Sequence, residues 1–212
     1  YSNSTHSATT VTTAATATTI NGGNSNLKIY GNNISNVNNG ICVVGPTAAS
    51  DHNNGIDIGG TSVATANTIT NYGATGTFSS YSSVSGSVNG ILVRNSININ
   101  VSYNNITSSN AGTTSGTLRG IFFPSFSNSP IGIINQNITN NVIPLIGGNI
   151  TGTVVGILCE SSTSNSTSTL TINNNTVQNS SITGATSGTL TGIQNSVVSE
   201  TLNMNNNIIQ NN

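Results

Sequence analysis

The stretch Leu27-Lys-Ile-Tyr-Gly-Asn-Asn-Ile-Ser-Asn36 contains a motif that recurs along this 212-residue chain. The motif has two apolar residues two positions apart, a short Asn-rich step, and then Ile or Val followed by polar residues. Alternation of apolar and polar residues is typical of β-strands that bury one face. The other copies are residues 99–108, 131–140, 170–179 and 202–211, with a weaker copy at 67–71.

Each copy supplies one apolar residue, its core anchor, and one amide side chain two positions before the anchor. Successive anchors are 32 to 39 residues apart. The predicted anchors are Ile34, Ile69, Ile106, Ile138, Val177 and Ile209. The amide residues are Asn32, Asn67, Asn104, Gln136, Asn175 and Asn207. Because stacked amides donate and accept along one axis, we expect these six to form an internal structural ladder.

A second motif lies between the anchors: Gly-Ile, with an apolar residue two positions before the glycine. It occurs at Gly90-Ile91, Gly120-Ile121, Gly156-Ile157 and Gly192-Ile193. Near the start of the chain, Gly40-Ile41 and Gly55-Ile56 are both candidates for the equivalent position.

Two or three short strands in each repeat make a unit that cannot bury its own apolar face, so the units must stack on one another. The sequence therefore predicts an all-β protein, a right-handed parallel β-helix (solenoid) of about five to six coils of roughly 32–39 residues. Whether each repeat is one large coil or two small ones stays open at this point.

We expect residues 1–212 to form a single β-solenoid segment, with a Ser/Thr-rich lead-in over residues 1–20 and repeats from about residue 21. Solenoids normally cap their ends to protect the exposed strand edges. Here the motif continues to the final residues without a charged strand or a helix. The segment is therefore expected to belong to a longer chain or to a filament.

The Asn/Thr-rich motifs resemble the repeats of right-handed parallel β-helices of the pectin-lyase-like type. Residues 32–36 and 38–41 (Asn-Asn-Ile-Ser-Asn and Asn-Asn-Gly-Ile) carry this resemblance, as do residues 104–107 and 173–179. It covers about residues 20–212 and is greatest to the versions found in very long surface and secreted proteins of Bacteroidota-type bacteria. The resemblance implies a fold and an extracellular or cell-surface location. It does not imply an activity, because such folds include both polysaccharide-cleaving enzymes and non-catalytic adhesins.

The composition excludes several classes of function. Lys and Arg together number three, Asp and Glu number four, and the net charge is −1. A nucleic-acid-binding protein needs a basic surface, so no nucleic-acid partner is expected. No run of about 20 apolar residues is present, so we expect no membrane span.

The carboxylates do not form a pattern typical of catalysis. Glycoside hydrolysis uses two carboxylates held close together. Asp51 and Asp57 share one turn region, but Glu160 and Glu200 lie far along the chain and at different positions of their repeats. Asp51, His52 and Asp57 are the only local cluster of ionisable groups, and we interpret it as a solvated loop. We therefore expect a protein that is not an enzyme, with no catalytic, cofactor-binding or metal-binding residue.

Two smaller groups of residues are candidates for a ligand site. Arg94 and Arg119 follow or lie within the Gly-Ile strands and are interpreted as isolated surface charges rather than contacts for an acidic glycan. The aromatic residues Phe122, Phe123 and Phe126 are expected to pack in the core and loops rather than to form a sugar-stacking platform.

The two cysteines are predicted to remain unpaired. Cys42 and Cys159 are about three coils apart, roughly 14 Å at one strand spacing per coil. A disulfide requires Cα atoms within about 7 Å. At least one of the two thiols is expected to be buried.

These features favour a non-catalytic structural or adhesive module of an extracellular or cell-surface fibre. Its expected partners are further copies of itself or further repeats of the same chain, with surface glycans as another partner. The alternative is a carbohydrate-binding or polysaccharide-degrading β-helix. A third hypothesis is ice binding through Thr75-Gly-Thr77, Thr151-Gly-Thr153 and Thr189-Leu-Thr191, although coils of unequal length argue against the register that an ice-binding face requires.

Overall fold

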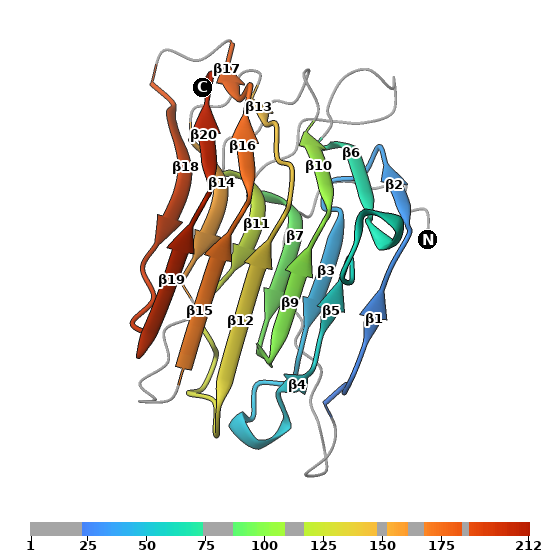
Figure 1. The fold of residues 1–212 in the computed structure, drawn as a ribbon, viewed down its shortest axis with the longest axis vertical. Coiled ribbons are helices and arrows are strands. Elements are labelled where there is room, and N and C mark those ends of the chain that lie inside the picture. The colour runs from blue at the N-terminus through green and yellow to red at the C-terminus, as the bar shows by residue number, and fades with distance from the viewer. Residues whose placement is uncertain (1–22, 74–86, 109–116, 148–151, 161–167, 184–186) are drawn as a thin grey trace.

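The computed structural model describes residues 23–73, 87–108, 117–147, 152–160, 168–183 and 187–212. Over these residues the protein is an all-β parallel solenoid (Figure 1). Its strands are two to seven residues long. The described residues also include two single-turn 3-10 helices, η1 (Ala49–Asp51) and η2 (Val63–Thr65), neither of which has the length or hydrophobicity of a transmembrane helix.

Three columns of parallel strands run along the solenoid. The first is a six-stranded sheet: β1 (Lys28–Ile29), β5 (Asp57–Ile58), β9 (Ile99–Ser102), β12 (Ile134–Thr139), β15 (Ser168–Asn173) and β19 (Thr201–Asn205). The second holds β2 (Asn33–Ser35), β6 (Thr68–Tyr72), β10 (Asn105–Ser108), β16 (Thr176–Gln178) and β20 (Ile208–Gln210), with Val142 bridging β10 and β16. The third is a five-stranded sheet: β3 (Ile41–Val44), β7 (Val88–Arg94), β11 (Leu118–Phe123), β14 (Thr153–Cys159) and β18 (Thr189–Asn195).

Two short pairs lie between these columns. They are β4 (Asn53–Asn54) with β8 (Ser96–Ile97), and β13 (Ile146–Gly147) with β17 (Ser181–Ile182). Each repeat therefore forms one large coil that contributes one strand or bridge to each column, which answers the question left open by the sequence.

The solenoid makes about four turns, counted as the steps between neighbouring strands of the five-stranded sheet. This is fewer than the five to six coils expected. The sequence estimate counted copies of a motif, whereas a turn is the step from one copy to the next. The last copy, moreover, adds strands to the first two columns only.

The Gly-Ile motif builds the third column, and the structure identifies its first copy. Ile41 is aligned with Ile91 in the pairing of β3 with β7, so Gly40-Ile41 is the equivalent position and Gly55-Ile56 is not. Glycine is required here by close approach between coils. A Cβ on Gly120 would lie 2.4 Å from the Gly156 carbonyl oxygen and 2.4 Å from the Ile143 Cγ2.

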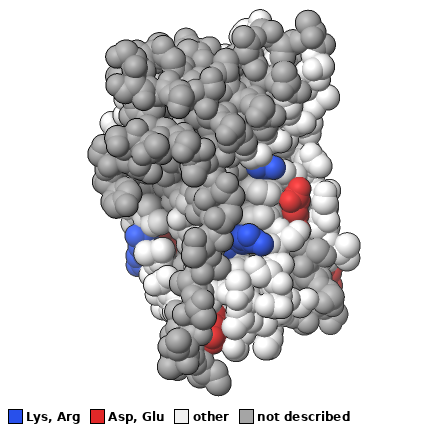
Figure 2. Space-filling view, turned by 180° about the vertical axis from the view of Figure 1, so that it is seen from behind, with Lys and Arg blue, Asp and Glu red and all other residues white. Residues whose placement is uncertain are grey.

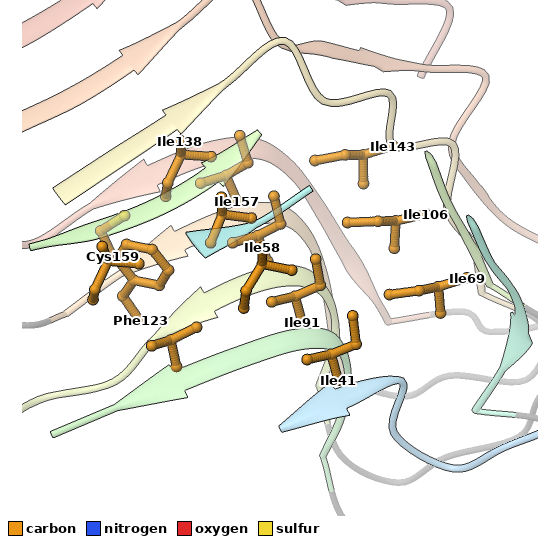
Figure 3. Packing of buried hydrophobic residues seen from close by; sticks show 14 of the residues in the cluster. Ile41, Ile58, Ile69, Ile91, Ile106, Phe123, Ile138, Ile143, Ile157 and Cys159 are labelled. Carbon is orange, nitrogen blue, oxygen red and sulfur yellow. The ribbon is translucent and has the colours of Figure 1, made fainter. Parts of the chain in front are cut away.

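Each glycine of this column receives the core anchor of the following coil. Gly40 faces Ile69, Gly90 faces Ile106, Gly120 faces Ile143, Gly156 faces Val177 and Gly192 faces Ile209. Figure 3 shows Ile69, Ile106 and Ile143 stacked in one column, opposite the isoleucines of the Gly-Ile strands. Five of the six predicted anchors, all except Ile138, lie on strands of the second column.

Ile138 is buried in the core, as predicted, but its assignment to the same position as the other five anchors is wrong. Ile138 lies on β12 in the first column, where it is aligned with Val101 and Ile172. Ile143 occupies the anchor position, fully buried against Gly120. The sequence motif was aligned to the wrong residues in this copy, because Ile131 and Ile133 were taken as its apolar pair. Both lie in the segment before β12, where Ile131 is 67% exposed and Ile133 is 62% exposed.

Candidate functional site

The most extensive arrangement of functional groups in the described structure is a ladder of asparagines inside the solenoid. In each step the Nδ2 of one asparagine donates to the Oδ1 of the next, over 2.9–3.0 Å. The main-chain N–H of most members donates to the same oxygen, as Asn104 does to Asn141 at 2.9 Å. The ladder consists of Asn32, Asn67, Asn104, Asn141, Asn175 and Asn207.

The second amide hydrogen of each interior member is bonded in the opposite direction. The Nδ2 of Asn141 donates to the Val101 carbonyl at 2.9 Å, and the Nδ2 of Asn175 donates to the Ile138 carbonyl at 2.8 Å. Each side chain thus ties three consecutive coils together. Because Asn141 and Asn175 are fully buried, these bonds also satisfy polar groups that would otherwise be costly to remove from water.

Gln136 was predicted as the fourth ladder residue, and this prediction is wrong. Asn141 takes that position, while Gln136 lies in the first column, aligned with Ile99 and Leu170 and 3% exposed. The amide of Gln136 therefore replaces an apolar residue of the motif. That substitution hid the true repeat, which ends in Asn141-Val142-Ile143, and shifted the match by five residues.

The ladder position is preceded by a left-handed backbone residue in most coils. The φ values are 63° at Gly31, 58° at Asn140, 57° at Asn174 and 56° at Asn206. Asparagine and glycine adopt this region at the lowest cost. The Asn-Asn pairs at residues 140–141, 174–175 and 206–207 therefore combine a corner residue with a ladder residue.

The ionisable cluster expected at residues 51–57 is divided between two cavities. Asp51 and His52 are buried and line a cavity of about 390 Å³, whereas Asp57 lines a separate groove of about 420 Å³. The His52 ring stacks on Phe126, with centroids 5.2 Å apart. Burial lowers the pKa of His52, against the opposing effects of the Thr47 backbone and the Asp51 charge. No three His, Cys, Asp or Glu side chains gather at one place in the described ranges.

Asp57 is held by two neutral donors on the outer face of the six-stranded sheet. The Tyr30 hydroxyl donates to one carboxylate oxygen, and Asn100 Nδ2 donates to the other at 2.7 Å. The network continues through Ser102 to Thr139, whose hydroxyl oxygens are 2.8 Å apart. The hydrogen bond to Asp57, together with burial and the carboxylate charge, raises the pKa of Tyr30 to about 12. Spacing alone could not reveal this network, because it joins strands of different coils.

The phenylalanines occupy three different environments rather than one platform. Phe123 is in the core, Phe126 stacks on His52, and Phe122 faces outward beneath the guanidinium of Arg119, whose Cζ is 4.2 Å from the ring centroid. Burial lowers the pKa of Arg119, and the charge of Glu160 opposes that change. The back of the molecule shows isolated charges of both signs rather than a patch of one sign (Figure 2).

Both cysteines are free, and Cys159 is buried, in agreement with the prediction. Cys159 points into the core from β14, whereas Cys42 lies on the other face of its sheet, in the apolar cluster that includes Leu92 and Phe122. Burial raises the pKa of Cys42 to about 11. It raises the pKa of Cys159 to about 12, with a smaller contribution from Glu160.

The chain matches no protein-family model, no curated protein and no solved structure.

Proposed function

We propose that this chain is a non-catalytic structural and adhesive module of an extracellular or cell-surface fibre, lengthened by the stacking of further coils. The asparagine ladder is the observation that carries the proposal. It places the longest buried hydrogen-bonded network of the described residues along the solenoid axis, where it joins coil to coil. A protein built for length needs this kind of axial cohesion.

The last described coil shows where a further coil would pack under this proposal. Its core positions are exposed where earlier coils cover theirs: Leu202 is 46% exposed and Ile209 is 52% exposed, whereas Leu170 and Val177 are each 1% exposed. Asn207 accepts hydrogen bonds from Asn175, in the same way as the earlier ladder members accept from theirs. A further coil, from the same chain or from a second copy, would cover these apolar groups and continue the ladder.

The first test is electron microscopy of the native material together with the mass of the intact chain. Long, uniform fibres are the expected result. Compact particles containing a single chain of 21.5 kDa would contradict the proposal.

A variant pair then tests the stacking surface. Ile209→Lys places a charge on the exposed end of the core, so we expect end-to-end association, measured by sedimentation velocity, to fall at least tenfold. Val198→Lys is the matched control, because Val198 is 72% exposed but lies outside the three columns. Equal association of the two variants would exclude this surface.

The groove around Asp57 favours a second candidate function, carbohydrate binding. It combines a carboxylate with the amide of Asn100 and the hydroxyls of Ser102 and Thr139, which are groups that pair with sugar hydroxyls. We expect Asp57→Asn to weaken any retention on immobilised polysaccharide. The exposed Glu200→Gln removes the same charge elsewhere and serves as its control. Cleavage of a polysaccharide that Asp57→Ala abolishes would replace the non-catalytic proposal with an enzymatic one.

A further inference from the structure

The outer face of β12, β15 and β19 carries a two-dimensional array of short polar side chains. The strands are paired without a register shift, so that Asn135, Thr169 and Thr201 form one row. Asn137, Thr171 and Asn203 form the next row. Neighbouring side chains therefore repeat at about 4.8 Å across the strands and about 6.7 Å along them.

This array holds its register although the coils differ in length. Ladder asparagines are separated by 37, 34 and 32 residues in the last three steps, yet the strands between them stay aligned. The length differences lie in the connections between strands. Unequal coil length is therefore no obstacle to a regular face. By contrast, the Thr-x-Thr pairs singled out in the sequence do not build one: Thr153 is aligned with Thr189, but Val155 stands opposite Thr191, and residues 75–77 and 151 lie outside the described ranges.

Most hydrogen-bonding side chains of this face are not used within the molecule; the exception is Asn135, whose Nδ2 donates to Asn98 Oδ1 at 3.4 Å. The side chains of Asn137, Thr169, Thr171, Thr201 and Asn203 make no hydrogen bond to any other residue of the chain as the structure describes it. This sets them apart from the ladder asparagines, whose amides are bonded in both directions. All five side chains are half-buried or exposed.

The chemistry of the face limits what can bind it. Strands β12, β15 and β19 contain no charged residue and no aromatic residue. An anionic polymer would lack a cation to pair with, and a pyranose ring would lack an aromatic ring to stack on. What remains is a preorganised grid of donors and acceptors on a sheet whose strands β12, β15 and β19 lie side by side in Figure 1. Threonine in a strand has few rotamers, so little side-chain entropy is lost when its hydroxyl is fixed in place.

We infer that this face binds the surface of ice. An ice plane presents water molecules at fixed two-dimensional spacings. Many weak hydrogen bonds formed together by an ordered, uncharged grid can hold such a plane without displacing a strongly bound hydration shell. This inference does not rest on the proposed stacking of coils, because the face lies on the side of the solenoid and not at its end.

Partition into slowly grown polycrystalline ice tests the inference. We expect the wild-type chain to be enriched in the ice at least tenfold over a non-binding fluorescent protein in the same solution. Thr171→Tyr puts a bulky ring in the middle of the array and should lower that enrichment about tenfold. Thr191→Tyr makes the same change at a half-buried strand threonine of the third column and should leave the enrichment unchanged.

Circular dichroism and sedimentation of both variants separate loss of binding from loss of fold or of assembly. Asn137→Lys provides a second disruption of the array that adds charge instead of bulk. Exclusion of the wild type from ice, or equal partition of the two tyrosine variants, would overturn the inference. Retention on crystalline cellulose that Thr171→Tyr abolishes, without enrichment in ice, would assign the face to a polysaccharide surface instead.

Discussion

Asparagine has two roles at adjacent positions of the last three coils. Asn140 takes the left-handed corner at φ 58°, and Asn141 follows it into the ladder. The general ladder pattern was predictable, because Asn32, Asn104 and Asn175 stand two residues before an apolar anchor. The fourth coil was not, since a buried Gln136 stands where the motif has an apolar residue. A single polar side chain in the core was enough to mislead an alignment based on apolar spacing.

The first prediction contrasts the true ladder residue with the mistaken one. Asn141→Ala should lower the free energy of unfolding by about 3 kcal/mol, because it removes the buried oxygen that accepts hydrogen bonds from both the main-chain N–H and the Nδ2 of Asn104. Gln136→Leu should change it by less than about 1 kcal/mol or raise it, because the side chain lies between Ile99 and Leu170. Chemical denaturation followed by circular dichroism measures both. A larger loss of stability in Gln136→Leu than in Asn141→Ala would instead favour Gln136 as the ladder residue.

At the scale of the element, the third column depends on glycines that let two coils approach each other. The sequence predicted these strands from the recurrent Gly-Ile pair. It could not choose between Gly40 and Gly55, because both stand before isoleucine and only the pairing of β3 with β7 distinguishes them. The reason for the glycine was also hidden. The space that a Cβ would fill is taken by an anchor from the next coil, 16 to 29 residues further along the chain.

The second prediction concerns that close approach. Gly120→Ala should lower the free energy of unfolding by about 3 kcal/mol, because the new methyl group would overlap the Gly156 carbonyl and Ile143. Gly31→Asn is the control: nothing lies within 4 Å of its would-be Cβ, and asparagine tolerates the φ of 63°. The control should change stability by less than about 0.5 kcal/mol. Thermal and chemical unfolding give the comparison, and equal losses in both variants would refute it.

The third prediction concerns the contact between η1 and the segment after β11, where His52 stacks on Phe126. The folded protein holds the pKa of His52 below its ordinary value of about 6.5. Below that pH the unfolded chain binds a proton more readily than the folded one, so the free energy of unfolding should fall as the pH drops.

Denaturation curves at pH 7.5 and pH 5.0 test this for the wild type and for His52→Gln. The variant should lose less stability between the two pH values, whatever its stability at pH 7.5, because glutamine does not titrate. An identical loss in both proteins would show that other groups produce the pH dependence.

At the scale of the whole molecule, the sequence repeat was enough to predict the fold but not the function. A repeat near 35 residues predicted a parallel solenoid because each unit must bury its apolar face against the next. The polar face on β12, β15 and β19 could not be read from the sequence, since Asn135, Thr169 and Thr201 come together only through strand pairing across coils. With so few charged residues, no chemical motif marks a site along the chain. The surfaces of the solenoid differ in which side chains the register of neighbouring strands brings together.

The direction of the ladder has a mechanical consequence. Its hydrogen bonds point along the axis, so a pull on the two ends of the solenoid loads the coils in series, and they should yield one after another. Successive ladder asparagines are 32 to 37 residues apart, so each coil that opens would release roughly 105–135 Å of extended chain. A fibre built in this way would lengthen in discrete steps under tension and dissipate energy at each step.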